Sequence, residues 1–231
     1  MANPAVVSTN TGNYIVGSLT STTITSSVTP VDGNVILAAM VIVGVIGDPG
    51  SISGPAGWSP VEQNLTGAGS SSRVAVFSKV SSSESGSYVF SWSNISSIGF
   101  WIFAEYGGGD SDNPLDVSDN LQNLLGTSSS APSLTPATWN NYNTLVCIWA
   151  AALQVGSIMS MSGPADMTLQ AQSKSLSISF PALMLADLPL LSNASTGTKT
   201  ATAAISTQSL GISLLVKQSI WASSIPVGSA A

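Results

Sequence analysis

The stretch Tyr88-Val89-Phe90-Ser91-Trp92-Ser93 alternates aromatic residues with mostly small ones. Successive side chains of a β-strand point to opposite faces of a sheet, so Tyr88, Phe90 and Trp92 share one face. The stretch Ser175-Leu176-Ser177-Ile178-Ser179-Phe180 repeats this pattern, with three serines on the second face. Both stretches are predicted to be half-buried strands.

Other segments are apolar at consecutive positions, which is typical of central strands that are covered on both faces. These segments are Val35–Ile46, Arg73–Val80, Phe100–Ala104, Leu145–Leu153 and Gly211–Val216. A short helix is conceivable only over Leu183–Leu188, where Pro189 would end it. Many short strands joined by Gly- and Pro-rich turns predict an all-β protein with an antiparallel β-sandwich.

The two halves of the chain resemble each other in the order of their landmarks. Thr29-Pro30 precedes one buried run and Thr135-Pro136 precedes another, at an offset of 106 residues (136 − 30 = 106). Three further pairs follow at slightly larger offsets: Ser53-Gly54-Pro55 with Ser162-Gly163-Pro164, Gly86 with Gly197, and Gly99 with Gly211. Small insertions in surface loops produce such a drift. We expect either one sandwich with interleaved halves or two similar sandwiches.

The expected organisation is a single unit over residues 1–231. Its repeated halves are 22–125 and 135–217, joined by a Ser-, Thr- and Pro-rich linker over Gly126–Pro136. Short terminal arms, 1–21 and 218–231, complete the chain.

Composition narrows the function classes. Charged residues make up 7% of the chain, with five Lys and Arg in total, no histidine and a net charge of −6. Nucleic-acid binding depends on cationic side chains, so neither DNA nor RNA is an expected partner. The longest apolar run is shorter than a membrane helix, and no secretory signal is evident, so we expect no membrane insertion. A surface of Ser, Thr, Asn and Gly suits packing beside other proteins.

An acidic stretch over Asp110–Asn120 is the best candidate for a metal site. Asp110, Asp112 and Asp116 could supply oxygen ligands to Ca²⁺, although the spacing does not fit an EF-hand, because Leu115 stands where glycine is required. The alternative is a solvated loop in which Asp and Asn side chains cap turns. No other cofactor is expected.

Carboxylates are the only acid–base groups on offer, so glycoside hydrolysis is the one enzymatic hypothesis. Glu105 would be the acid, with Glu62 or Glu84 as its partner. A lone strand glutamate is more often structural, and we therefore expect no enzyme.

Two aromatic residues are candidates for stacking on a glycan. Trp139 and Tyr142 are flanked by asparagines and are predicted to be exposed. In contrast, Trp58, Trp92 and Trp101 are expected in the core. The single cysteine, Cys147, lies in an apolar run and is expected to be a buried, unreactive side chain.

The chain also resembles a family of jelly-roll-like β-sandwich domains found in tailed-phage virion proteins and bacterial surface proteins. The motifs that carry the likeness are Asp32-Gly33-Asn34-Val35, Gly57-Trp58, Arg73–Val80, Gly86–Trp92, Tyr106-Gly107-Gly108 and Asn113–Asp116. The likeness covers about Val31 to Val216 and departs from the pattern at Ala165 and Met167, near the place where a second Gly-Trp would stand.

This resemblance implies a display, cementing or adhesion module without catalytic residues. The expected function is that of a capsid decoration or cement protein on the virion surface of a tailed bacteriophage. Its partners would be other virion proteins, above all the major capsid protein, and copies of itself, as a trimer. The alternatives are a tail-fibre or baseplate adhesin that binds host glycan, and a secreted bacterial carbohydrate-binding or surface protein.

Overall fold

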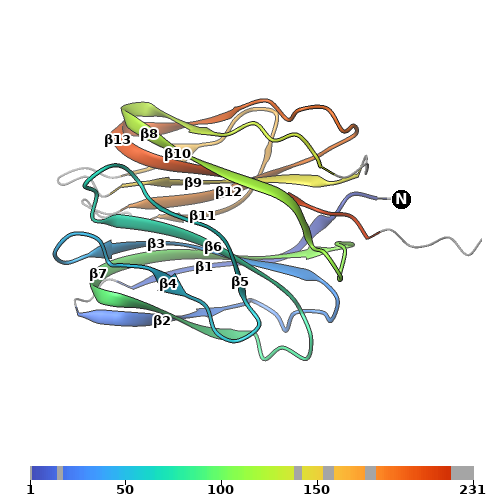
Figure 1. The fold of residues 1–231 in the computed structure, drawn as a ribbon, viewed down its shortest axis with the longest axis horizontal. Helices are drawn as coiled ribbons and strands as arrows, with labels where there is room; N and C mark the ends of the chain where they lie inside the picture. Colours follow the sequence, from blue (N-terminus) through green and yellow to red (C-terminus); the bar gives the residue numbers. More distant parts are fainter. Residues whose placement is uncertain (1, 15–17, 138–141, 153–158, 175–180, 220–231) are drawn as a thin grey trace, which may run out of the picture.

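A computed structural model describes residues 2–14, 18–137, 142–152, 159–174 and 181–219 of the chain. The described residues form two antiparallel sheets that pack face to face (Figure 1), which confirms the predicted all-β sandwich. No helix in these residues has the length and apolar character needed to cross a membrane.

Each half of the chain builds one sheet. The first sheet contains β1 (Ala5–Tyr14), β2 (Leu19–Thr25), β3 (Val35–Gly44), β4 (Ile52–Ser53), β5 (Ser59–Leu65), β6 (Ser72–Val80) and β7 (Ser87–Gly107). The second sheet contains β8 (Leu115–Ala131), β9 (Thr144–Ala151), β10 (Met161–Ser162), β11 (Thr168–Lys174), β12 (Ala182–Pro189) and β13 (Lys199–Val216). The halves therefore lie one on the other and do not interleave.

The two sheets repeat one topology. The strand order is β1-β7-β3-β6-β5 in the first sheet and β8-β13-β9-β12-β11 in the second, with β4 on β7 and β10 on β13. In the first sheet β1 pairs with the end of β7 and β2 pairs with its start. In the second sheet the one long strand β8 takes both places, because its start pairs with the end of β13 and its end pairs with the start of β13. The repeat predicted from the Pro and Gly landmarks thus appears as a repeat of strand order.

The register corrects one of the landmark pairs. Gly99 pairs with Ile42 of β3. In the second sheet Ala151 lies seven residues after the start of β9, as Ile42 lies seven residues after the start of β3, and it pairs with Ser209 and not with Gly211. Ser209 is therefore the counterpart of Gly99, and the steady outward drift of the offsets was wrong at this point.

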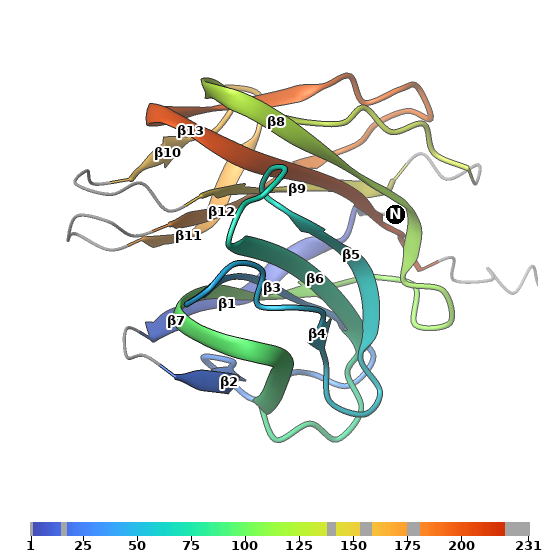
Figure 2. The same cartoon turned by 60° about the vertical axis from the view of Figure 1, so that its left-hand side comes forward.

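Long bent strands give each half a second layer. The first part of β7 pairs with β2 and β4, and its last part pairs with β1 and β3. The first part of β7 therefore lies over the outer face of its own sheet, and the start of β13 does the same in the second half (Figures 1 and 2). The result is a stack of four layers.

This stack explains why the central strands are apolar at every position. Val35, Leu37, Ala39 and Val41 of β3 face the core between the two halves. The residues between them, Ile36, Ala38, Met40 and Ile42, face a second core within the first half. Strand β9 divides its side chains in the same way between the central core and a third core. Both faces of these strands are buried, as predicted.

Three predictions about segments were wrong. The short helix over Leu183–Leu188 is part of strand β12, because pairing with β9 and β11 on both sides overrides a local preference in so short a run. Residues 126–131, expected as a linker, belong to β8, and the sheets are joined instead by residues 108–114.

The expected arm 1–21 contains β1, which pairs with β7. Thr has a high strand propensity and strand pairing overrides the turn preference of Ser, so the Ser- and Thr-rich composition of these segments was misleading. The stretch Ser175–Phe180 lies outside the described residues.

The edges of the two sheets meet along two seams. β1 lies against β11, and β5 lies against β8. Since β8 is the counterpart of β1 and β11 is the counterpart of β5, an approximate two-fold axis along the strands exchanges the halves. Hydrogen bonds close both seams, from Ser173 Oγ to the Gly12 carbonyl in one and from Ser118 Oγ to Glu62 in the other.

Candidate binding site at the loop end

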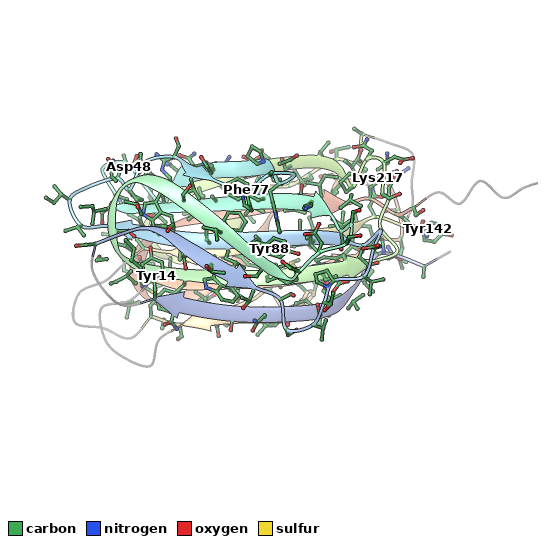
Figure 3. All side chains as sticks on the ribbon, turned by 90° about the horizontal axis from the view of Figure 1, so that it is seen from below. Tyr14, Asp48, Phe77, Tyr88, Tyr142 and Lys217 are labelled. Carbon is green, nitrogen blue, oxygen red and sulfur yellow. The ribbon has the colours of Figure 1, made fainter. Side chains whose placement is uncertain are left out.

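The strands run lengthwise and give the molecule two different ends. At one end, which we call the terminus end, Asn3 donates to the carbonyl of Asn143, and Gln218 donates to the carbonyl of Ala2. The opposite end, which we call the loop end, holds the turn after β3, the bend of β7 and the turn within β8. In Figure 3 Asp48 marks the loop end, and Tyr142 and Lys217 mark the terminus end.

Aliphatic side chains project from the loop end, and we call this set the apolar tips. The most exposed are Ile46 at 91%, Leu124 at 90% and Leu125 at 68%. Val45 and Ile95 are about half exposed. Val45, Ile46 and Ile95 belong to the first half and the two leucines to the second, so both halves contribute.

A groove of about 410 Å³ lies among the tips of the first half, and we call it the tip groove. It is lined by Ser18, Val45, Ile46, Ser93, Asn94 and Ile95. The backbone N–H of Val45 donates to the carbonyl of Ile95 at 3.0 Å, which fixes the two walls relative to each other. The described residues that line it carry no charge, and three of the six are aliphatic, so the groove suits an uncharged occupant that is at least partly apolar.

An ion pair braces the loop that carries Ile46. Arg73 on β6 holds both carboxylate oxygens of Asp48, with Nε 2.9 Å from Oδ1 and NH2 2.5 Å from Oδ2. The hydrogen bond from Arg73 is the largest cause of the lowered pKa of Asp48. Asn94 donates to the Asp48 carbonyl, and Gly50 N–H donates to its carboxylate. A two-point Arg–carboxylate contact fixes geometry, so this loop presents its apolar side chains from a defined backbone.

The residues proposed as calcium ligands are not brought together. Asp110 accepts from the N–H groups of Asp112 and Asn113 and lies 3.5 Å from Nζ of Lys217. Burial alone would raise the pKa of Asp110, but the two backbone hydrogen bonds and the nearby Lys217 outweigh it, so the pKa is lowered. Asp116 instead accepts from the N–H of Ala137. Among the described residues no three acidic, Cys or His side chains form a group that could hold a metal ion. The arrangement matches the alternative, in which acidic side chains cap a turn.

The carboxylates considered for glycoside hydrolysis each have different partners. Glu105 is fully buried and accepts from Ser8, Asn34 and the N–H of Val31. Glu62 accepts from Ser118 and Asn120 across the β5–β8 seam. Glu84 forms an ion pair with Lys79. Their contacts brace the fold at three separate places.

The predictions for the aromatic residues and the cysteine can be compared with their positions in the structure. Tyr142 is 38% exposed at the terminus end, and Trp139 lies outside the described residues. The core positions of Trp58, Trp92 and Trp101 are confirmed, since each is less than a tenth exposed. Cys147 is buried as expected, and burial raises the pKa of its thiol to about 12.

Sequence reasoning missed two features. Val45 and Ile46 were counted in the apolar run Val35–Ile46, and Leu124 and Leu125 were not singled out, although Gly44 and Gly126 beside them are turn signals that could have revealed them. The second feature is a groove of about 250 Å³ between β1, β11 and β12, where Asp187 accepts from Gln170 at 2.9 Å. Asp187 is the one charged residue of β12, and burial raises its pKa.

Comparison with known proteins gives no relative: no family model, no curated sequence and no solved structure matches the chain.

Proposed function

We propose that the chain is a non-catalytic structural protein of a larger assembly and that it contacts a neighbour through the apolar tips. The observation that carries this proposal is the set of five aliphatic side chains, each at least half exposed, at one end of the molecule. Exposed apolar patches of this kind mark interaction sites. Ile46 projects from a loop braced by Arg73, which lowers the entropy lost on binding.

The assembly we propose is the capsid of a tailed bacteriophage, with the chain as a decoration or cement protein on its exterior. The support for this choice is the resemblance of the motifs between Val31 and Val216 and the low content of charged residues, 7% of the chain. The outer layers expose hydroxyl groups, as at Thr23, Thr25 and Ser91. A surface of this kind can lie beside the major capsid protein without charge repulsion.

Co-sedimentation with purified empty capsids tests the proposal. The wild-type chain should pellet with the shells, and the double variant Ile46→Ser, Leu124→Ser should bind at least about tenfold more weakly, because the buried apolar contacts are lost. Leu191→Ser is the matched control, since Leu191 is 82% exposed but follows β12 at the terminus end. If the wild type and both variants bound the capsids equally well, the apolar tips would not form the contact with the capsid. Binding to host glycan that is abolished by Tyr142→Ala, without binding to shells, would replace the capsid role with that of an adhesin.

A further inference from the structure

We propose that the groove between β1, β11 and β12 binds the ammonium group of a primary amine, with Asp187 as the residue that receives it. We call this groove of about 250 Å³ the seam groove, because it lies where β1 meets β11. Asn3, which marks the terminus end, is part of its lining. The seam groove is therefore at the opposite end of the molecule from the apolar tips, and the inference goes beyond the proposed function without depending on it.

The position of Asp187 in the sheet is one that normally holds an apolar side chain. Leu183 and Leu185 alternate with it along β12, and both face the core between the two halves. Asp187 takes the next place in that row and is only 5% exposed. An aspartate is almost never this deeply buried unless it is paired. Its carboxyl group therefore requires donors.

The described residues give Asp187 few donors. Gln170 Nε2 donates to Oδ1 at 2.9 Å, and this is the one hydrogen bond of ordinary geometry that Asp187 receives from them. The buried hydroxyl group of Tyr106 is near enough to offset part of the rise that burial causes in the pKa of Asp187, but it forms no such hydrogen bond. Glu105, in contrast, receives three. Oδ2 of Asp187 therefore keeps unused acceptor capacity beside the seam groove.

The β5–β8 seam shows how the protein itself can supply such donors. Glu62 of β5 accepts from Ser118 at 2.8 Å through Oε1 and from Asn120 at 2.6 Å through Oε2. Both donors come from the opposite half of the chain. At the β1–β11 seam no described residue of β1 donates to Asp187, although β1 forms one wall of the groove. The N–H groups of a ligand would there take the place that Ser118 and Asn120 take beside Glu62.

Both strands that form the seam are irregular at the groove. β11 carries one extra residue, Gln170, between the positions that pair with Ala186 and Leu185. The side chain of this extra residue is the one that contacts Asp187. The register of β1 also shifts directly after Val6, which lines the groove. β-Bulges re-aim side chains and are over-represented next to active sites, so these irregularities favour a binding role for this stretch of the seam.

Charge makes a cation the favoured ligand. An ionised carboxylate only accepts hydrogen bonds, so its partner must donate them. Withdrawal of a carboxylate from water is costly, and a paired cation offsets part of this cost. A cationic donor meets both requirements at once.

The cationic residues of the chain itself lie elsewhere. The chain has five Lys and Arg against eleven Asp and Glu. Four of the five form ion pairs with other acids: Arg73 with Asp48, Lys79 with Glu84, Lys199 with Asp166 and Lys217 with Asp110. The fifth, Lys174, stands at the far end of β11 from Thr168. The cation for Asp187 therefore comes from a ligand.

The size and the lining of the seam groove select a primary amine on a short stem. At about 250 Å³ the groove is smaller than the sites that take drug-sized ligands. Pro4, Val6 and Pro189 give it apolar surface against which methylene groups can pack, as the stem of a lysine does. An ammonium group is compact and carries three N–H donors. One donor suits Oδ2 of Asp187, and the Thr168 hydroxyl group is a further acceptor in the lining.

An NMR titration of the full, isotope-labelled chain with n-butylamine tests the site. The titration is run at about pH 7.5, where the amine keeps its proton. The backbone N–H signals of Asp187 and Gln170 should shift and saturate, with a dissociation constant on the order of 1 mM. The absence of any saturable shift would overturn the inference.

Asp187→Asn should weaken this binding by about tenfold or more, because the amide keeps the shape of the side chain and loses its charge. Asp112→Asn is the matched control, since it removes the same charge from an exposed side chain, and it should bind as the wild type does. Thermal unfolding shows that each variant is folded. An equal loss in both variants, or an unchanged affinity in Asp187→Asn, would overturn the role of Asp187.

Two further probes keep the test on the wild-type protein. n-Butanol has the same stem without the charge, and butyltrimethylammonium has the charge without an N–H donor. Both should bind at least about tenfold more weakly than n-butylamine. Equal binding of the alcohol would overturn the need for a cation, and equal binding of the methylated ion would overturn the donated hydrogen bonds.

A lysine derivative distinguishes the two sources of such an amine. If Nα-acetyl-lysine N-methylamide binds at least as tightly as n-butylamine, the seam groove takes the lysine side chain of a neighbouring protein. If the backbone groups of the derivative prevent binding while n-butylamine still binds, the groove takes a small free amine. Either result keeps Asp187 as the receiving group.

Discussion

Asn34 donates a hydrogen bond of 2.7 Å from Nδ2 to Oε1 of Glu105, a carboxylate with no exposed surface. The N–H of Val31 donates to the same oxygen at 2.8 Å, and Ser8 Oγ donates to Oε2 at 2.9 Å. Three donors thus satisfy the carboxylate inside the protein, as buried charges require. Glu105 ties the turn before β3 and the strand β1 to β7.

Glu105→Gln should lower the free energy of unfolding by about 1.5–3 kcal/mol, because an amide offers one acceptor oxygen where the carboxylate offered two. Urea unfolding measures the loss. Glu62→Gln is the control and should cost less, since Glu62 is only partly buried. A glycosidase activity that disappears in a fully stable Glu105→Gln protein would contradict the structural role.

Asp187→Asn should remove part of the pH dependence of stability. Burial raises the pKa of Asp187 in the folded protein, so the folded state holds this proton more tightly than the unfolded state does. Its contribution to stability is complete below the unfolded pKa of about 3.9 and is lost as the pH rises through the folded pKa. The variant should therefore gain stability relative to the wild type as the pH rises toward neutral. Thermal unfolding at a series of pH values measures this difference, and parallel curves for the two proteins would contradict it.

Gly86→Ala should destabilise the protein more than Gly197→Ala. Both glycines have positive φ, at 75° and 67°, and precede the equivalent strands β7 and β13, so each substitution costs about 1–2 kcal/mol in backbone strain. A Cβ at Gly86 would also lie 2.4 Å from Ser26 Oγ, whereas a Cβ at Gly197 would meet nothing within 4 Å. Denaturant midpoints of the two variants test the order, and equal losses would show that Ser26 moves aside freely.

Arg73→Met should loosen the Ile46 loop and cost little global stability. The ion pair with Asp48 is partly exposed and is worth at most about 1 kcal/mol. Because Arg73 lowers the pKa of Asp48, this contribution is present above about pH 3.9 and is lost as the pH falls. The readout is amide hydrogen exchange at Val45, whose N–H bonds to Ile95, and exchange should become faster. Unchanged exchange would mean that the ion pair does not brace the loop.

The sequence was sufficient for the sandwich and for its repeat, because period-two alternation and turn residues are local signals. The run Val35–Ile46 was read correctly as a buried strand, yet its last two residues leave the sheet after Gly44. Hydrophobicity alone does not distinguish an aliphatic side chain that packs in a core from one that projects into solvent. Ile46 was missed for this reason.

The candidate sites were harder to predict because their chemistry depends on distant partners. Asp110 looked like a metal ligand until the fold placed Lys217 beside it, and Glu105 looked like an acid until Asn34 and Ser8 surrounded its oxygens. No spacing within the acidic stretch reveals a cation that lies more than a hundred positions away. The burial of Trp58 and Cys147, in contrast, was predictable from their immediate neighbours.

The repeated strand order has a consequence for how this molecule could have diversified. A dimer of two identical subunits must change both copies whenever its gene changes. Here the two similar halves share one polypeptide, so one half can carry the tip groove while the other carries the exposed Leu124 and Leu125. A nearly symmetric scaffold within one chain can therefore carry two dissimilar surfaces.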